Sequence, residues 1–126
     1  MKLRIKGNSL RLRISPSEME RLMRSGRIEE TIHFGSEEGA RLTYGLEHNA
    51  RAGAITVRYR PQEVTVVVPS QDVGRWADGP DVGLYGESVS THGRLEVAVE
   101  KDFACLDKSD EDNTDTFPNP QQGMAC

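Results

Sequence analysis

Several features that would point to a class of function are scarce or missing in this chain of 126 residues. It has only two cysteines, so it is not a small secreted scaffold held together by several disulfides. No apolar run approaches the roughly 20 residues that span a bilayer. The net charge of −4 excludes a uniformly basic nucleic-acid-binding protein. With 36% hydrophobic and 29% charged residues, the composition indicates a soluble globular protein, and the length fits a single domain over residues 1–126.

The first residues carry no targeting signal. Met1 leads directly into Lys2-Leu3-Arg4-Ile5-Lys6, which has neither the apolar core nor the cleavage site of a signal peptide. We therefore expect a cytoplasmic protein whose cysteines are reduced and which does not associate with membranes.

An internal repeat is the most informative positive feature. In the first copy, about residues 2–48, alternating apolar residues around Gly7-Asn8 predict a β-hairpin. The capping box Ser15-Pro16-Ser17-Glu18 then starts a short helix that ends at Gly26. The same pattern returns in a second copy, about residues 54–101. The matching positions lie 54 residues apart through the hairpin and the helix and just past it, where Ile28 is aligned with Val82. In the closing strands they lie 53 residues apart.

These patterns predict an α+β fold built from a duplicated ββαββ unit. About eight mostly antiparallel strands would form one curved sheet or an open barrel, with two helices on one face and a C-terminal extension over residues 102–126. Trp76 and Met23 are expected in the core. The strand residues expected beside them are Leu3, Ile5, Leu10, Leu12, Ile14, Leu42, Tyr44, Leu46, Ile55, Val57, Tyr59, Val64, Val66, Val68, Leu95, Val97 and Val99.

The opposite face of the predicted sheet is basic. Alternation places there Lys2, Arg4, Lys6, Arg11, Arg13, Arg41, Arg58 and Arg60. Because a guanidinium binds phosphate or carboxylate through a planar fork, the six arginines of this set are candidate anion-binding residues. The simpler alternative is a solvated sheet face, partly neutralised by Glu63, Glu96 and Glu100. Single-stranded nucleic acid is disfavoured, because Tyr44 and Tyr59 fall on the apolar side and aromatics make up only 6% of the chain.

Charge is divided unevenly along the chain. Residues 1–60 carry 12 Lys and Arg against 7 Asp and Glu, and residues 61–126 carry 4 against 13. The two parts would attract each other within one chain, or copies of the chain would pair as a homo-oligomer.

The C-terminal extension has six acids and one lysine. Its composition is typical of a disordered tail, but Phe103 and Cys105 continue the alternation of the last strand, and Phe117-Pro118-Asn119-Pro120 predicts a rigid turn. We expect residues 106–126 to fold back onto the domain with Phe117 as the main anchor. On the basic face, this acidic segment would compete with anionic ligands.

The same extension holds the only candidate metal site. Asp110, Asp112 and Asp115 resemble part of a calcium loop, which here lacks the central Gly and the final Glu. A metal-dependent hydrolase or metal-binding protein using these acids is the alternative function. There is no nucleophile elbow, P-loop or paired-cysteine motif, and a Cys105–His48 dyad would need a thiol on the core face. The sequence leaves open whether the protein is an enzyme and indicates no cofactor.

Three segments carry a family resemblance. The opening Met1-Lys2-Leu3-Arg4-Ile5-Lys6-Gly7-Asn8-Ser9 and the C-terminal segments Glu100-Lys101-Asp102-Phe103-Ala104-Cys105-Leu106-Asp107 and Asp115-Thr116-Phe117-Pro118-Asn119-Pro120 resemble an uncharacterised family of small bacterial proteins. The resemblance covers the whole chain and implies no activity, cofactor or catalytic residue. The residues themselves favour a non-enzymatic cytoplasmic binding or interaction module, whose arginine-rich face takes anionic groups or the acidic tail.

Overall fold

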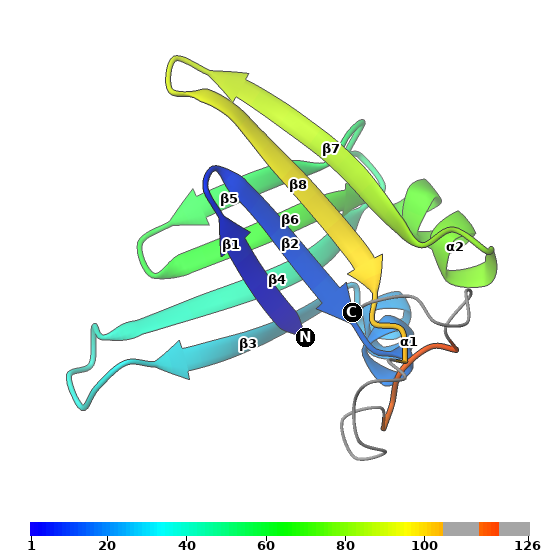
Figure 1. Ribbon diagram of the computed structural model, residues 1–126, viewed down its shortest axis with the longest axis horizontal. Coiled ribbons are helices and arrows are strands. Elements are labelled where there is room, and N and C mark those ends of the chain that lie inside the picture. The colour runs from blue at the N-terminus through cyan, green and yellow to red at the C-terminus, as the bar shows by residue number, and fades with distance from the viewer. Residues whose placement is uncertain (105–113, 119–126) are drawn as a thin grey trace.

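The computed structural model describes residues 1–104 and 114–118. Within these residues the order strand, strand, helix, strand, strand occurs twice, which confirms the predicted α+β class (Figure 1). The first half contains β1 (Lys2–Lys6), β2 (Ser9–Ile14), α1 (Pro16–Ser25), β3 (Arg27–His33) and β4 (Arg41–Asn49). The second contains β5 (Thr56–Arg60), β6 (Glu63–Pro69), α2 (Ser70–Asp78), β7 (Gly83–Ser90) and β8 (Gly93–Lys101).

The described strands form two four-stranded sheets and no closed barrel. Sheet A has the order β1-β2-β8-β7, and sheet B has the order β3-β4-β6-β5. Each sheet joins a hairpin of one half to a hairpin of the other through a central parallel pair, β2 with β8 or β4 with β6. The two hairpins of one half, which a helix separates, therefore lie in different sheets (Figure 1).

The two halves are similar in register as well as in order. In sheet A, Leu12 pairs with Leu3 and with Val99. In sheet B, Val66 pairs with Val57 and with Leu46, and these positions follow the offsets of 54 and 53. One alignment changes: Ile28 lies opposite Leu46 and Leu84 lies opposite Val99, so Ile28 corresponds to Leu84 and not to Val82. Origin by duplication remains a prediction.

Local sequence determines where α1 begins and ends. The side chain of Ser15 accepts a hydrogen bond from the backbone N–H of Glu18, and the Glu18 carboxylate accepts one from the backbone N–H of Ser15. At the other end Gly26 adopts a left-handed conformation, with φ of 84°, and its N–H donates to the carbonyl of Leu22. The predicted capping box and stop signal are both confirmed.

The core lies between the two sheets and beside the helices, which lie together at the end towards which β2 and β8 run (Figure 1). Trp76 is fully buried, as predicted, and its indole N–H donates to the carbonyl of Val82 at 3.2 Å. The prediction for Met23 is wrong, because its side chain is 43% exposed. The buried arc of α1 runs through Glu18, Met19 and Leu22 and leaves Met23 at its margin.

Side chains expected on the inner side become more exposed along the outer strands β1 and β5. Leu3 and Val57 pack against the core, whereas Ile5 is 65% exposed and Tyr59 is 73% exposed. The expectation that the latter two are core residues is therefore wrong. Alternation places a side chain on the inner side of its strand, but burial there requires a packed layer opposite it.

The described part of the C-terminal extension is anchored. Phe117 packs against the core and forms an isolated parallel bridge with Phe103. Its N–H donates to the carbonyl of Asp102, and its carbonyl accepts from the N–H of Ala104. The ammonium of Lys101 lies 5.5 Å from the centre of the Phe117 ring. The predicted role of Phe117 as an anchor is confirmed for residues 114–118.

Candidate functional site

The basic residues that the sequence places on one face lie on two separate sheets. Because Leu10 and Leu12 point to the core, alternation puts their neighbours on the outer surface of sheet A. This surface, here called the basic face, comprises Lys2, Arg4, Lys6, Arg11 and Arg13. Arg41, Arg58 and Arg60 belong to sheet B. The expectation of a single six-arginine surface is therefore wrong, since it assumed one continuous sheet.

The outer surface of sheet B neutralises Arg58 with a carboxylate of its own sheet, that of Glu47. Nη1 and Nη2 of Arg58 donate to the two carboxylate oxygens of Glu47 at 3.0 and 3.1 Å. These hydrogen bonds from Arg58 are the main reason why the pKa of Glu47 lies below its ordinary value. Arg41 donates to the carbonyl of Glu38 at 2.6 Å, and Arg60 forms no ion pair within the described part of the chain.

Sequence reasoning missed Arg27, which is central to sheet B. Its guanidinium donates to Glu29 at 2.8 Å, to Glu47 at 3.1 Å and to the hydroxyl of Thr65 at 3.1 Å. It lies directly over Gly45, where a Cβ atom would be only 2.7 Å from Nη2. Alternation in residues 27–33 gave no signal for this, because the site depends on how β3, β4 and β6 are placed side by side.

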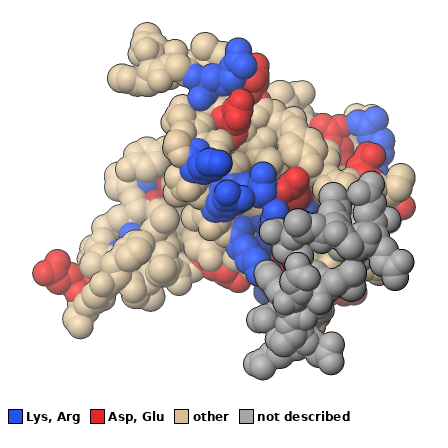
Figure 2. Space-filling model, viewed as in Figure 1, with Lys and Arg blue, Asp and Glu red and all other residues tan. Residues whose placement is uncertain are grey.

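The basic face of sheet A is not neutralised in this way. Arg4 lies opposite Arg11 and Lys2 lies opposite Arg13, so two pairs of like charges face each other across β1 and β2. Arg11 and Arg13 share one carboxylate, that of Glu100, at 3.2 and 3.8 Å, and Lys2 pairs with Asp102 at 2.8 Å. Among the described residues, Arg4 and Lys6 have no ion-pair partner. Figure 2 shows basic side chains gathered over β1 and β2, with acidic side chains beside them.

A cavity opens beside Arg4 and Lys6, which have no ion-pair partner among the described residues, and beside Arg11, whose partner is Glu100. It has a volume of about 270 Å³ and is lined by Arg4, Lys6, Ser9 and Arg11. A second cavity of about 190 Å³ adjoins it and shares Arg4 and Arg11. The hydroxyl of Ser9 donates to the carbonyl of Lys6 at 2.6 Å, which ties the turn between β1 and β2 together. We call the first of these the anion cavity, because each of its three charged side chains is a cation.

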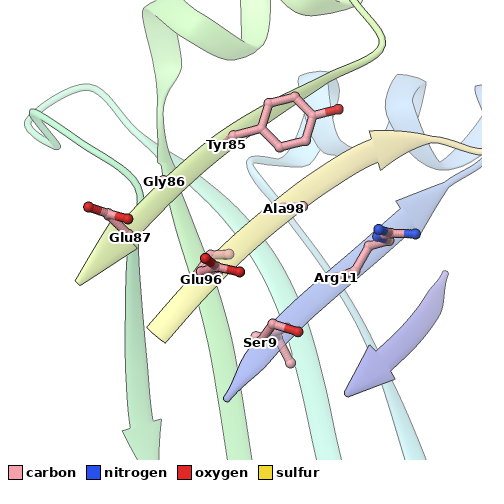
Figure 3. A pocket seen from close by; sticks show the side chains of 9 residues that line it. Ser9, Arg11, Tyr85, Gly86, Glu87, Glu96 and Ala98 are labelled. Atoms are coloured by element: carbon pink, nitrogen blue, oxygen red, sulfur yellow. The ribbon is translucent and has the colours of Figure 1, made fainter. Parts of the chain in front are cut away.

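A larger groove of about 460 Å³ lies on the same surface, across β2, β8 and β7 (Figure 3). Ala98 lies in its centre, with Tyr85 and Glu87 on β7, Glu96 on β8, and Ser9 and Arg11 on β2. The hydroxyl of Tyr85 donates to Glu100 at 2.8 Å. Burial, followed by this hydrogen bond, raises the pKa of Tyr85 to about 12. The groove shares Ser9 and Arg11 with the anion cavity, so the surface is basic on one side and acidic on the other.

The acids proposed as metal ligands do not form a site in the described residues. Asp110 and Asp112 lie outside those residues, as do Cys105 and Cys126. Asp115 accepts hydrogen bonds from the backbone N–H and the hydroxyl of Ser17, at 3.2 and 2.5 Å. These bonds hold the pKa of Asp115 below its ordinary value. No three His, Cys, Asp or Glu side chains in residues 1–104 and 114–118 are grouped as metal ligands.

The histidine weighed as a catalytic base has a different neighbour. Nδ1 of His48 lies 2.7 Å from the hydroxyl of Ser70, the first residue of α2. Neither cavity on the basic face nor the groove of sheet A includes this pair. The contact therefore joins the start of α2 to β4 away from those openings.

Comparison with known proteins gives a family and no activity. A family model, described as a family of unknown function (DUF7009), matches residues 1–121. The chain belongs to this family. No curated protein and no solved structure matches it. Within the described residues, neither α1 nor α2 is long and apolar enough to cross a membrane. The site therefore has to be interpreted from its own chemistry.

Proposed function

We propose that this protein is a cytoplasmic, non-enzymatic binding module that takes a phosphate or carboxylate group on the basic face of sheet A. The observation that carries the proposal is the anion cavity, where Arg4, Lys6 and Arg11 converge. No acidic side chain of the described residues pairs with Arg4 or Lys6.

The arrangement of these cations supports a ligand. Like charges directly opposite each other on neighbouring strands cost stability, by about 0.2–1 kcal/mol for a pair. An anion bound between Arg4 and Arg11 would turn this repulsion into two charge-assisted hydrogen-bonding sites. Ser9 also lines the cavity, but its hydroxyl donates to the carbonyl of Lys6, so the donors for an anion are the side chains of Arg4, Lys6 and Arg11.

Sheet B provides an internal comparison. By the strand registers, Arg58 is the counterpart of Arg4, and Arg60 is the counterpart of Lys6. Arg58 is held by two hydrogen bonds from its guanidinium to Glu47. Arg4 has no such carboxylate partner among the described residues, although it occupies the position on sheet A that corresponds to Arg58. The difference favours a role for Arg4; at the next position Arg60, like Lys6, has no ion pair among the described residues.

The metal-dependent hydrolase is not proposed. Asp115, the one member of its acid set that the structure describes, is occupied by Ser17 at the start of α1.

Inorganic pyrophosphate is the probe for the proposed function, measured by calorimetry or NMR titration at low ionic strength, where exposed charges are least screened. We expect saturable binding that the double variant Arg4→Gln/Lys6→Gln weakens by about tenfold or more, which corresponds to ~1.4 kcal/mol. Arg60→Gln is the matched control, because it removes the sheet B counterpart of Lys6, and it should leave binding unchanged. Absence of saturable binding, or equal loss in the control, would overturn the proposal.

A further inference from the structure

The groove over Ala98 has an occupied counterpart on sheet B. There the guanidinium of Arg27 lies over Gly45, within hydrogen-bonding distance of Glu29, Glu47 and Thr65. The small residue below it allows this close approach, because any Cβ at position 45 would meet the guanidinium. Sheet B thus supplies its own cation to the centre of its outer surface.

The strand registers identify the equivalent positions on sheet A. Glu29, Gly45 and Thr65 are neighbours across β3, β4 and β6. Tyr85, Ala98 and Arg11 are neighbours in the same way across β7, β8 and β2. Ala98 therefore corresponds to Gly45. Two residues further along these strands, the pair Arg27 and Glu47 on sheet B corresponds to the pair Gly83 and Glu100 on sheet A.

Sheet A keeps the small central residue but lacks the arginine that would cover it. A Cβ at Gly83 would lie 2.5 Å from the carbonyl oxygen of Val99, so no side chain fits there without movement of the backbone. Ala98, Arg11 and Tyr85, the counterparts of Gly45, Thr65 and Glu29, line an open groove of about 460 Å³ on sheet A (Figure 3). Glu100, the counterpart of Glu47, lies outside this lining and pairs with Arg11.

The wall of the groove away from the basic face suits a cation. Glu96 is exposed and has no ion-pair partner among the residues described. Glu87 has only a surface pair with Arg94, at 3.3 Å with both side chains more than half exposed, and such pairs contribute little. Figure 3 shows Glu87 and Glu96 on neighbouring strands, across the groove from Arg11.

We propose that this groove binds a guanidinium or ammonium group of the same ligand whose anionic group occupies the anion cavity. The ligand is then a small zwitterion that lies across β2, with its cation near Glu96 and its anion near Arg4 and Lys6. Since neighbouring strands are about 4.8 Å apart, the two charges are separated by roughly 7–10 Å. This inference rests on the proposed function, and it adds the second half of the ligand.

Three matched compounds test the inference. 5-Guanidinopentanoate carries both charges at about this spacing, pentanoate carries only the anion, and butylguanidine carries only the cation. We expect 5-guanidinopentanoate to bind at least about tenfold more tightly than either of the others. In Glu96→Gln, its affinity should fall to that of pentanoate, while binding of inorganic pyrophosphate is not weakened. Glu37→Gln, in the exposed loop between β3 and β4, is the control and should keep the full difference.

The outcomes separate the two proposals. If pyrophosphate binds but 5-guanidinopentanoate and pentanoate bind equally, or if their difference persists in Glu96→Gln, the zwitterion inference is wrong and the anion site stands. If no anion binds, both are wrong. Ala98→Met provides a second variant that does not depend on charge. It should fill the groove and remove the preference for 5-guanidinopentanoate, with pyrophosphate binding retained.

Discussion

Glu47 accepts hydrogen bonds from Arg58 through both carboxylate oxygens, and from Arg27 on the neighbouring strand. The three side chains connect β3, β4 and β5 across the outer surface of sheet B. The sequence placed Arg58 among the candidate anion-binding residues, and Glu47 explains why its guanidinium is not free.

The first prediction concerns pH. Hydrogen bonds from Arg58 lower the pKa of Glu47 in the folded state below its ordinary 4.5. The unfolded chain therefore takes up the proton first as the pH falls. The stabilisation is present above about pH 4.5 and is lost as the pH falls through the lowered pKa of the folded state. On acidification from about pH 6 to about pH 3, Glu47→Gln should lose less of its free energy of unfolding than the wild type, as measured by urea unfolding. Glu38→Gln, in the exposed loop, should keep the wild-type slope, and an identical slope in Glu47→Gln would contradict the assignment.

The second prediction concerns the C-terminal anchor. Phe117→Ala removes a half-buried ring that packs against Phe103 and Lys101, so it should lower the free energy of unfolding by about 1–2 kcal/mol. Deleting residues 107–126 should lower the melting temperature at least as much as Phe117→Ala does. Phe34→Ala is the matched control, because Phe34 is 68% exposed, and its effect should stay within about 0.5 kcal/mol. Equal effects of the two Phe→Ala substitutions in denaturant titrations would show that Phe117 is not an anchor.

The third prediction is a coupling between Gly45 and Arg27. A methyl group at position 45 displaces the guanidinium from Glu47 and Thr65, so Gly45→Ala should cost about 1 kcal/mol of stability. In the Arg27→Ala background this cost should disappear, because nothing remains over the backbone. A double-mutant cycle by urea unfolding measures the coupling. Gly53→Ala, with open space around it, is the control, and additive effects of the two changes would refute the contact.

The fourth prediction concerns the acidic segment that lies outside the described residues. If it competes for the anion cavity, removing four charges by Asp107→Asn, Asp110→Asn, Glu111→Gln and Asp112→Asn should tighten pyrophosphate binding by about threefold to tenfold. The double variant Asp78→Asn/Asp81→Asn removes acids near the end of α2 and tests for a general effect of net charge. An unchanged affinity, or the same gain in the control, excludes competition by the segment.

The sequence by itself determined the local structure. The Ser15 capping box and Gly26 mark the ends of α1 because the groups that satisfy its terminal N–H and carbonyl groups are neighbours in the chain. Gly7, with φ of 55°, marks the first hairpin turn for the same reason, since it tolerates a left-handed conformation. Alternation then assigned Arg4 and Arg11 correctly to one side of a hairpin whose two strands are joined by that turn.

Only the tertiary structure decided which hairpins share a sheet. Alternation determines which side of a strand a residue occupies, but it carries no information about the strand that lies next to it from a distant part of the chain. The pairing of β2 with β8, and of β4 with β6, separated Arg58 and Arg60 from Arg4. The pairing of β4 with β6 also set Thr65 beside Gly45, where its hydroxyl accepts a hydrogen bond from Arg27. The pairing of β2 with β8 formed the groove over Ala98. The groove across β2, β8 and β7 is a product of these long-range pairings, whereas the anion cavity lies within the hairpin of β1 and β2.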